Sequence, residues 1–221
     1  MAEQARDKAK PRGLVEVFHS KGTPVLVKSE PYTLPSGKTG YRKIDLQFED
    51  GQLLGKQVIE NIILNAGKDR IVESIAEGSI YKVSRMAIGD RGTLASDSTV
   101  PKVPDPLTTT GLYNEIYRAD VEDSVLNIGL PGVHEIQFVK TFSAVDIPVT
   151  SFSNQAEPVV NEVGLVMIDI SNPSGEDRPP VAAPNPVSSD EIVFSLRTFK
   201  SVPFEAANEI AVTIRYTIFV E

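Results

Sequence analysis

The sequence predicts an α+β fold that is mostly antiparallel β and sandwich-like, with a short helical pair and long extended loops. Apolar and polar residues alternate with a period of two in several segments, which is typical of strands with one buried face. A helical pattern is confined to residues 56–78. Two tracts, residues 89–111 and 171–190, are longer than ordinary connections and rich in Gly, Pro, Ser, Thr and Asp. The 221 residues suffice for one large β domain or two smaller ones.

The C-terminal segment EIAVTIRYTIFVE, residues 209–221, has the clearest strand pattern. Polar residues fall on one face of this strand together with a single alanine, whereas apolar residues fall on the other, so the pattern predicts a long, half-buried antiparallel strand. The residues expected on the core face are Ile210, Val212, Ile214, Tyr216, Ile218 and Val220, and those on the other face are Ala211, Thr213, Arg215 and Thr217.

Further strands are expected along most of the remaining chain. LVEVFHS and VLVKS predict two short strands around Gly22, and EVGLVMIDI, apolar on both faces, predicts a central strand. Three other segments alternate in the manner of half-buried strands. Their expected inward residues are Ile44, Leu46 and Phe48 in the first, Ile136 and Phe138 in the second, and Ile192, Phe194 and Leu196 in the third.

The helical pair is expected within KQVIENIILNAGKDRIVESIAEG. Asn65 resembles a cap at which a second helix starts, and Gly78 stands where a glycine commonly follows a helix. The apolar residues that indicate the first helix are Val58, Ile59, Ile62 and Ile63, and those that form one stripe on the second are Ile71, Val72, Ile75 and Ala76.

The two long tracts are expected to be extended arms. Residues 171–190 contain five prolines, and proline-rich segments favour extended geometry that suits contact with a neighbouring chain. Residues 1–13 are expected to be a flexible tail.

Charge is unevenly distributed along the chain, whose formal net charge is −8. Residues 1–43 hold nine Lys/Arg and four Asp/Glu, a net charge of +5, whereas residues 44–221 carry −13. A basic arm on an acidic body favours docking to an acidic neighbour such as another copy of the chain. The basic residues are interspersed with acids and form no compact stripe, so nucleic acid is not an expected partner. No membrane partner is expected, because no apolar run approaches the length of a membrane span.

The tetrapeptide Gly89-Asp90-Arg91-Gly92 does not match a phosphate-binding loop, because no Lys-Ser/Thr pair follows Gly92. Its glycines are interpreted as turn residues at a strand end. Asp90, Asp97 and Asp105 lie in one tract, but their spacing does not match the EF-hand pattern, and no metal site is assigned.

No catalytic constellation emerges from the sequence, and no enzyme activity or cofactor is expected. The chain has no cysteine, which excludes thiolate catalysis and zinc–thiolate sites. Its only histidines are His19 and His134, and strand parity predicts that His134 lies at a core edge. A carboxylate pair for glycan cleavage stays open, because the separation of two carboxylates is a spatial property.

Three segments, taken in order, resemble the N-terminal domain of phage tail-collar fibre proteins. They are LNAGKDRIVESIAEGSIYKVSRMAIGDRG (64–92), LYNEIYRADV (112–121) and VVNEVGLVMID (159–169). That family has a similar order of an asparagine-alanine-glycine helix start, a strand ending in AIGDG, an NE-Y-R segment and an EVGL-type strand. The resemblance covers residues 64–221. We therefore divide the chain into an N-terminal arm and attachment module, residues 1–60, and a tail-collar-fibre-like domain, residues 61–221.

The matched positions are expected to be scaffold positions, not catalytic ones. Gly164 is expected to permit a close backbone approach. Glu115 or Glu162 is expected to pair with Arg118 or Arg85, because an unpaired buried charge is costly. The matched positions are Asn65, Gly67, Gly89, Asp90, Asn114, Glu115, Tyr117, Arg118, Glu162 and Gly164.

The resemblance implies a structural virion protein of a phage tail or tail-like particle, an adaptor that anchors tail fibres to the baseplate or tail. It implies synthesis in the bacterial cytoplasm and a final location in the virion tail. The implied partners are copies of the chain, commonly as a homotrimer, baseplate or tail proteins, and tail fibre chains. Fibre chains normally continue into a shaft and tip, whereas this chain stops at Glu221, so a short adaptor is expected. The alternatives are a host-surface glycan-binding module and a glycan-cleaving enzyme.

Overall fold

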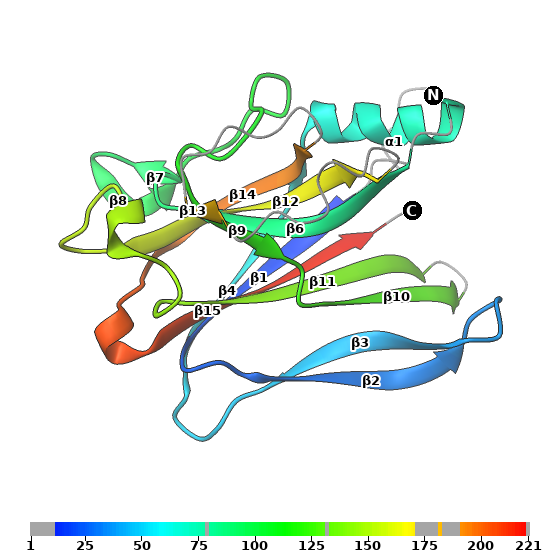
Figure 1. The fold of residues 1–221 in the computed structure, drawn as a ribbon, viewed down its shortest axis with the longest axis horizontal. Coiled ribbons are helices and arrows are strands. Elements are labelled where there is room, and N and C mark those ends of the chain that lie inside the picture. Colours follow the sequence, from blue (N-terminus) through cyan, green and yellow to red (C-terminus); the bar gives the residue numbers. More distant parts are fainter. Residues whose placement is uncertain (1–11, 78–79, 131–132, 171–180, 183–190, 220–221) are drawn as a thin grey trace, which may run out of the picture.

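The fold is a sandwich of two antiparallel sheets with one further element on each outer side (Figure 1). The computed structural model describes residues 12–77, 80–130, 133–170, 181–182 and 191–219. A helix covers the outer face of the six-stranded sheet, and a hairpin covers the outer face of the five-stranded sheet (Figure 1). The predicted fold class, mostly antiparallel β and sandwich-like, is confirmed.

The five-stranded sheet joins strands from both ends of the chain. Its order is β10 (Asp123–Leu130), β11 (Val133–Ser143), β15 (Ile210–Phe219), β1 (Arg12–Lys21) and β4 (Leu53–Glu60). The six-stranded sheet has the order β13 (Val181–Ala182), β9 (Glu115–Asp120), β6 (Tyr81–Gly89), β12 (Val159–Asp169), β14 (Glu191–Pro203) and β5 (Ile62–Ile63).

Two hairpins, one helix and two short turns complete the described part of the chain. The hairpins are β2 (Val25–Thr33) with β3 (Thr39–Gln47), and β7 (Thr93–Leu94) with β8 (Asp97–Pro101). The helix is α1 (Asn65–Glu77), and the two 3₁₀ turns are Val149–Ser151 and Ala206–Asn208. No helix of the described residues is long and apolar enough to cross a membrane.

The N-terminal region and the C-terminal strand share one sheet. β1 pairs with β15 along its whole length, from Arg12 opposite Phe219 to Lys21 opposite Ile210. On its other side β1 pairs with β4. The first 60 residues, predicted as a separate attachment module, therefore supply one central strand and one edge strand to a sheet completed by residues 123–219.

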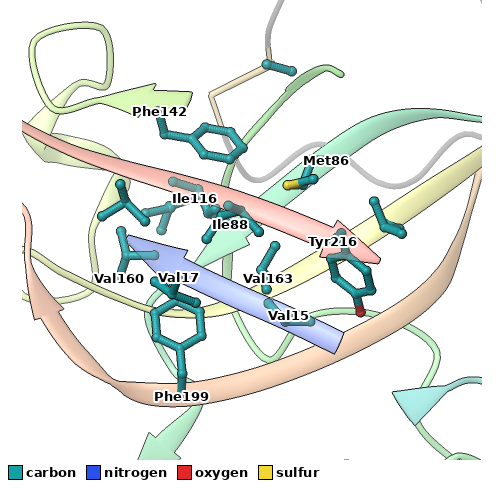
Figure 2. Close-up of a cluster of buried hydrophobic side chains, with 14 of the residues drawn as sticks. Val15, Val17, Met86, Ile88, Ile116, Phe142, Val160, Val163, Phe199 and Tyr216 are labelled. Atoms are coloured by element: carbon teal, nitrogen blue, oxygen red, sulfur yellow. The ribbon is translucent and has the colours of Figure 1, made fainter. Parts of the chain in front are cut away.

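The core lies between the two sheets, and β15 contributes one whole face to it. Figure 2 shows Val15 and Val17 of β1 and Tyr216 of β15 among Ile88 of β6 and Val163 of β12. The predicted core face of β15 is confirmed over the described residues Ile210, Val212, Ile214, Tyr216 and Ile218.

The opposite face of β15 is also buried, so the prediction of a half-buried strand is wrong. Ala211, Thr213 and Thr217 are buried, and Arg215 is nearly so. The β2–β3 hairpin covers this face, with Ile44 packed against Val125 and Val139 in a second, smaller core. The covering hairpin comes from a distant part of the chain, and local alternation does not reveal it.

Two other strand predictions are confirmed, those for β12 and β11, whereas the one for β14 is wrong in part. β12 lies centrally between β6 and β14, and Phe138 belongs to the core that Ile136 packs against. In β14 the simple alternation fails, because the register against β12 shifts between Leu165 and Val166. Phe194 consequently faces the main core, whereas Leu196 belongs to a separate cluster.

The first of the two predicted helices is wrong. Residues 53–60 form β4 and residues 62–63 form β5. All of the residues taken as its apolar positions are β-branched, which favours strands, and β4 gains an antiparallel ladder with β1. The second helix is confirmed as α1, but only Ile71 of its stripe packs on the core. Val72 and Ile75 are 63% and 82% exposed, and Gly78 lies outside the described residues.

The tract 89–111 is not a free arm. Residues 93–101 form the β7–β8 hairpin, which lies against β14. The hydroxyl of Thr198 donates to the carbonyl of Lys102, and the amide of Asn65 donates to the carbonyl of Pro106 at 3.0 Å. The tract thus contacts its own chain. The second tract, 171–190, lies outside the described residues except for β13.

Replacing Gly67 by alanine is expected to destabilise the protein by about 1–3 kcal/mol, although alanine is the better helix former. A Cβ at Gly67 would lie 2.5 Å from Cδ2 and 2.6 Å from the carbonyl oxygen of Phe194, a core residue of β14. Gly111→Ala is the matched control, because a Cβ there meets nothing within 4 Å. Urea unfolding of both variants tests this, and equal stability of the two would contradict it.

Candidate functional site

The three segments of the family resemblance meet at the carboxylate of Glu162. This side chain, on β12, is 0% exposed. Its Oε1 accepts the backbone amides of Arg91 at 3.1 Å and Asn114 at 2.9 Å, and its Oε2 accepts the amide of Tyr113 at 2.7 Å. One carboxylate thereby fastens both ends of the 91–114 segment to the central strand of the sheet.

Of the two carboxylates predicted to pair with Arg118 or Arg85, Glu115 pairs with Arg118, whereas backbone amides take the place of an arginine at Glu162. Its partners are backbone N–H groups, which provide partial positive charge without a second ion. Burial raises the pKa of Glu162 above its ordinary value, and the nearby Asp90 acts in the same direction. The three backbone donors lower the pKa and so oppose both effects.

Gly89 and Gly92 are required by the close approach of backbone to this carboxylate. A Cβ at Gly89 would lie 2.4 Å from Oε1 of Glu162 and 2.4 Å from the carbonyl oxygen of Asn114. A Cβ at Gly92 would lie 2.4 Å from the carbonyl oxygen of Asn161. Neither glycine has a positive φ, so the close approach and not the backbone conformation requires glycine here. Gly89 is the last residue of β6, which agrees with its predicted place at a strand end. At Gly164 a Cβ would lie 2.8 Å from Cδ1 of Leu112, the end of a side chain, and 3.3 Å from the backbone carbonyl oxygen of Ser195.

Asp90 and Asn161 extend the network on either side of Glu162. Asp90 Oδ1 accepts the side-chain amide of Asn114 at 2.7 Å and the hydroxyl of Ser153 at 3.0 Å. Asn161 Oδ1 accepts the amide of Gly92 at 2.6 Å, and its Nδ2 donates to the carbonyl of Asp90 at 3.2 Å. We call Asp90, Asn114, Ser153, Asn161 and Glu162 the carboxylate network.

A second set of charges, the arginine cluster, comprises Arg85, Arg118, Glu115, Asp120 and Glu191. Arg118 donates to both carboxylate oxygens of Glu115 at 2.7 Å, as predicted for this pair. Glu191, 5% exposed, accepts from Arg118 at 2.6 Å and from Arg85 at 3.0 Å. Burial lowers the pKa of Arg118, but Glu115 and Glu191 outweigh burial and raise it above its ordinary value.

A third set, on the outer face of the five-stranded sheet, is Glu16 between Arg215 and Lys56. The Nζ of Lys56 lies 2.6 Å from Glu16 Oε1, and Arg215 Nε donates to Oε2. Burial acts to raise the pKa of Glu16, but the two cations together hold it below 4.5.

The Glu16 pKa predicts a stability difference that disappears in acid. Because the folded pKa lies below the unfolded value, the carboxylate contributes stability above about pH 4.5 that is lost as the pH falls through the folded pKa. Glu16→Gln is therefore expected to be less stable than the wild type at pH 7 and equally stable below the folded pKa. Urea unfolding from pH 7 to pH 3 measures this. A difference independent of pH would contradict it, and Glu157→Gln, an exposed site, is the control.

The remaining predicted residues do not join a site. Asp97 accepts from Thr99, and Asp105 accepts from Leu107 and Thr108, so each closes its own turn away from Asp90. His134 is exposed on β11, which makes the predicted core-edge position wrong. Among the described residues no group of three His, Cys, Asp or Glu side chains has the arrangement of a metal site.

A cleft of about 440 Å³ opens beside the arginine cluster, lined by residues near the start of β6 and the end of β12 and by Phe138 of β11. Lys82, Arg85, Asp120 and Asp169 line it, together with the turn that joins β9 to β10. Arg85 Nε lies 3.0 Å from Asp120 Oδ1, and the two side chains form an ion pair there. The cleft thus carries charges of both signs.

Comparison of the chain with protein-family models, with curated proteins and with solved structures finds no match.

Sequence reasoning missed four members of the carboxylate network and the arginine cluster, namely Asp120, Ser153, Asn161 and Glu191. Asp120 and Ser153 have no distinguishing pattern around them in the sequence, and Glu191 is predicted only as the start of a strand. The one available signal was Asn161 directly before Glu162, since two adjacent polar residues interrupt an otherwise apolar strand. Two buried polar residues in such a strand require partners.

Proposed function

We propose that the protein is a structural component of a phage tail or tail-like particle, an adaptor that anchors tail fibres to the baseplate or tail. The observation that supports this best is the carboxylate network. Gly89, Asp90, Asn114 and Glu162 match the tail-collar fibre pattern in three separate segments, and these segments contact one another directly. The family pattern is spread over three segments of the chain. The contacts among these four residues give one structural reason for all three parts of that pattern.

The use of the buried carboxylates also supports an assembly role. The oxygens of Glu162 accept backbone amides, and those of Glu191 accept two arginines. These groups hold loops and strands in place, which suits a rigid part that makes protein–protein contacts. Copies of the chain, baseplate or tail proteins, and fibre chains are the proposed partners.

Deletion of the gene in its source organism tests the proposal. Particles purified from the deletion strain are expected to lack fibres in negative-stain electron microscopy, and complementation with the wild-type chain is expected to restore them. Particles with complete fibres that adsorb normally would overturn the proposal. Particles with complete fibres that fail to adsorb would also overturn it, in favour of a host-surface glycan-binding module.

A further inference from the structure

Strand β4 lies at the edge of the five-stranded sheet in the described part of the chain. It is the last strand of the five-stranded sheet and pairs with β1 on one side, and no strand of the described residues pairs with its other side. The side chain of Gln57 fixes β4 to β14. Its Nε2 donates to the carbonyl of Lys200 at 3.0 Å, and its Oε1 accepts the Lys200 amide at 3.1 Å. A fixed strand whose outer N–H and C=O groups have no ladder partner among the described residues is a template for another strand.

The backbone groups at this edge belong to Lys56, Val58 and Glu60. The amide of Asn61 donates to the carbonyl of Gly13 at 2.8 Å, so the odd-numbered residues of β4 turn their backbone groups towards β1. In an antiparallel ladder the residues between them point the opposite way. The same three residues carry exposed side chains, with Val58 54% exposed.

We propose that β4 pairs antiparallel with β4 of a second copy of this chain, about a two-fold axis through Val58. In that register Val58 lies opposite its own counterpart, and Lys56 lies opposite Glu60 of the other copy, twice by symmetry. The three outward pairs are all of the hydrogen-bonded kind and form about six backbone hydrogen bonds. Opposite charges directly across an antiparallel pair stabilise it.

A row of charged side chains on the outer face of the five-stranded sheet would continue into the second copy across such an interface. Arg215, Glu16 and Lys56 already form a row of alternating sign on the outer face. Glu60 is exposed, and its charge acts to raise the pKa of Arg197, although no salt bridge among the described residues includes it. In the proposed register Glu60 of the second copy continues this row beyond Lys56. A lysine on an edge strand ordinarily opposes pairing. Here the register gives Lys56 a carboxylate on both sides.

The proposed partner is a second copy of the chain, because β4 is complementary in charge to itself. In the antiparallel register centred on Val58, Lys56 of each copy lies opposite Glu60 of the other. Such an interface is isologous and closes at two copies. A threefold contact of the kind that the resemblance implies needs a different surface. The inference does not rest on the proposed function, since it concerns only the outer edge of β4.

Disulfide cross-linking of the full chain tests the register directly. The protein has no cysteine, so a single Val58→Cys supplies one reactive group per chain. Hydrogen-bonded antiparallel partners have Cα atoms about 5.5 Å apart, within the range that a disulfide spans. Under mild oxidation Val58→Cys is expected to form a covalent dimer. Val145→Cys, exposed in a turn, is the control and is expected to stay monomeric on a non-reducing gel.

Sedimentation equilibrium supplies the second test. The wild type is expected to show two copies, and Glu60→Lys, which sets two lysines opposite each other, is expected to raise the dissociation constant by about tenfold or more. Glu157→Lys, exposed in another part of the chain, is expected to leave it unchanged. A monomeric wild type, or cross-linking of Val58→Cys no faster than of Val145→Cys, would overturn the inference. A trimer in which Val58→Cys does not cross-link would overturn it as well.

Discussion

Replacing Glu162 by alanine is expected to lower the free energy of unfolding by about 3–5 kcal/mol. The backbone amides of Arg91, Tyr113 and Asn114 would each lose an acceptor within a buried site. Each buried donor left without a partner costs about 1–3 kcal/mol, less where water enters the space left by the side chain. The melting temperature should fall by about 2–4 °C for each kcal/mol lost.

Two variants separate the hydrogen bonds from the loss of side-chain volume. Glu162→Gln keeps the shape and one acceptor oxygen but turns an N–H group towards one of the donors, so a smaller loss of about 1–3 kcal/mol is expected. Glu157→Ala, at an exposed position, should change stability by less than about 0.5 kcal/mol. Hydrogen exchange adds a local readout, because the amides of Tyr113 and Asn114 should exchange faster in Glu162→Ala. If Glu162→Ala were as stable as Glu157→Ala, the carboxylate would not hold this segment.

Local pattern predicted those parts of the fold whose burial depends on near neighbours. The core face of β15 and the central position of β12 both follow from the sequence, because strand periodicity directly reflects which face is apolar. The outer face of β15 does not, since the β2–β3 hairpin that buries Arg215 lies far away in the sequence. The prediction of a helix around Val58 is wrong for a related reason. The apolar spacing of this segment fits a helix as well as a strand, and β1 decides between them.

Some members of the candidate site were predicted from the sequence, but the hydrogen bonds that join them were not. The resemblance singled out Gly89, Asp90, Asn114 and Glu162, and the structure brings these four together. The residue types predict an arginine partner for Glu115 or Glu162, and the structure shows one for Glu115. A carboxylate bound by backbone amides leaves no trace in the sequence, because any residue can supply an N–H group. The glycines are visible in the sequence. Because Gly89 and Gly92 have no side chain, their backbone can lie close to Glu162 and its neighbours.

Replacing Glu191 by alanine is expected to cost about 3 kcal/mol of stability, because this one carboxylate serves two nearly buried arginines. Arg85 and Arg118 are 5% and 4% exposed, and each donates to a different oxygen of Glu191. Removing one member of a buried ion pair costs about 3–5 kcal/mol. The expected value lies at the lower end, since Arg118 keeps Glu115 and Arg85 keeps Asp120.

Asp120→Ala is the matched control, because it removes another carboxylate from the same arginine. The side chain of Asp120 is 78% exposed and lies 3.0 Å from Arg85. An exposed ion pair contributes about 0–1 kcal/mol, so this variant should lose at most about 1 kcal/mol. Urea unfolding at pH 7 measures both variants. Equal losses would mean that burial does not decide the strength of these pairs. A much larger loss for Glu191→Ala would identify Glu191 as the residue that joins β14 to β6 and β9 across the sheet.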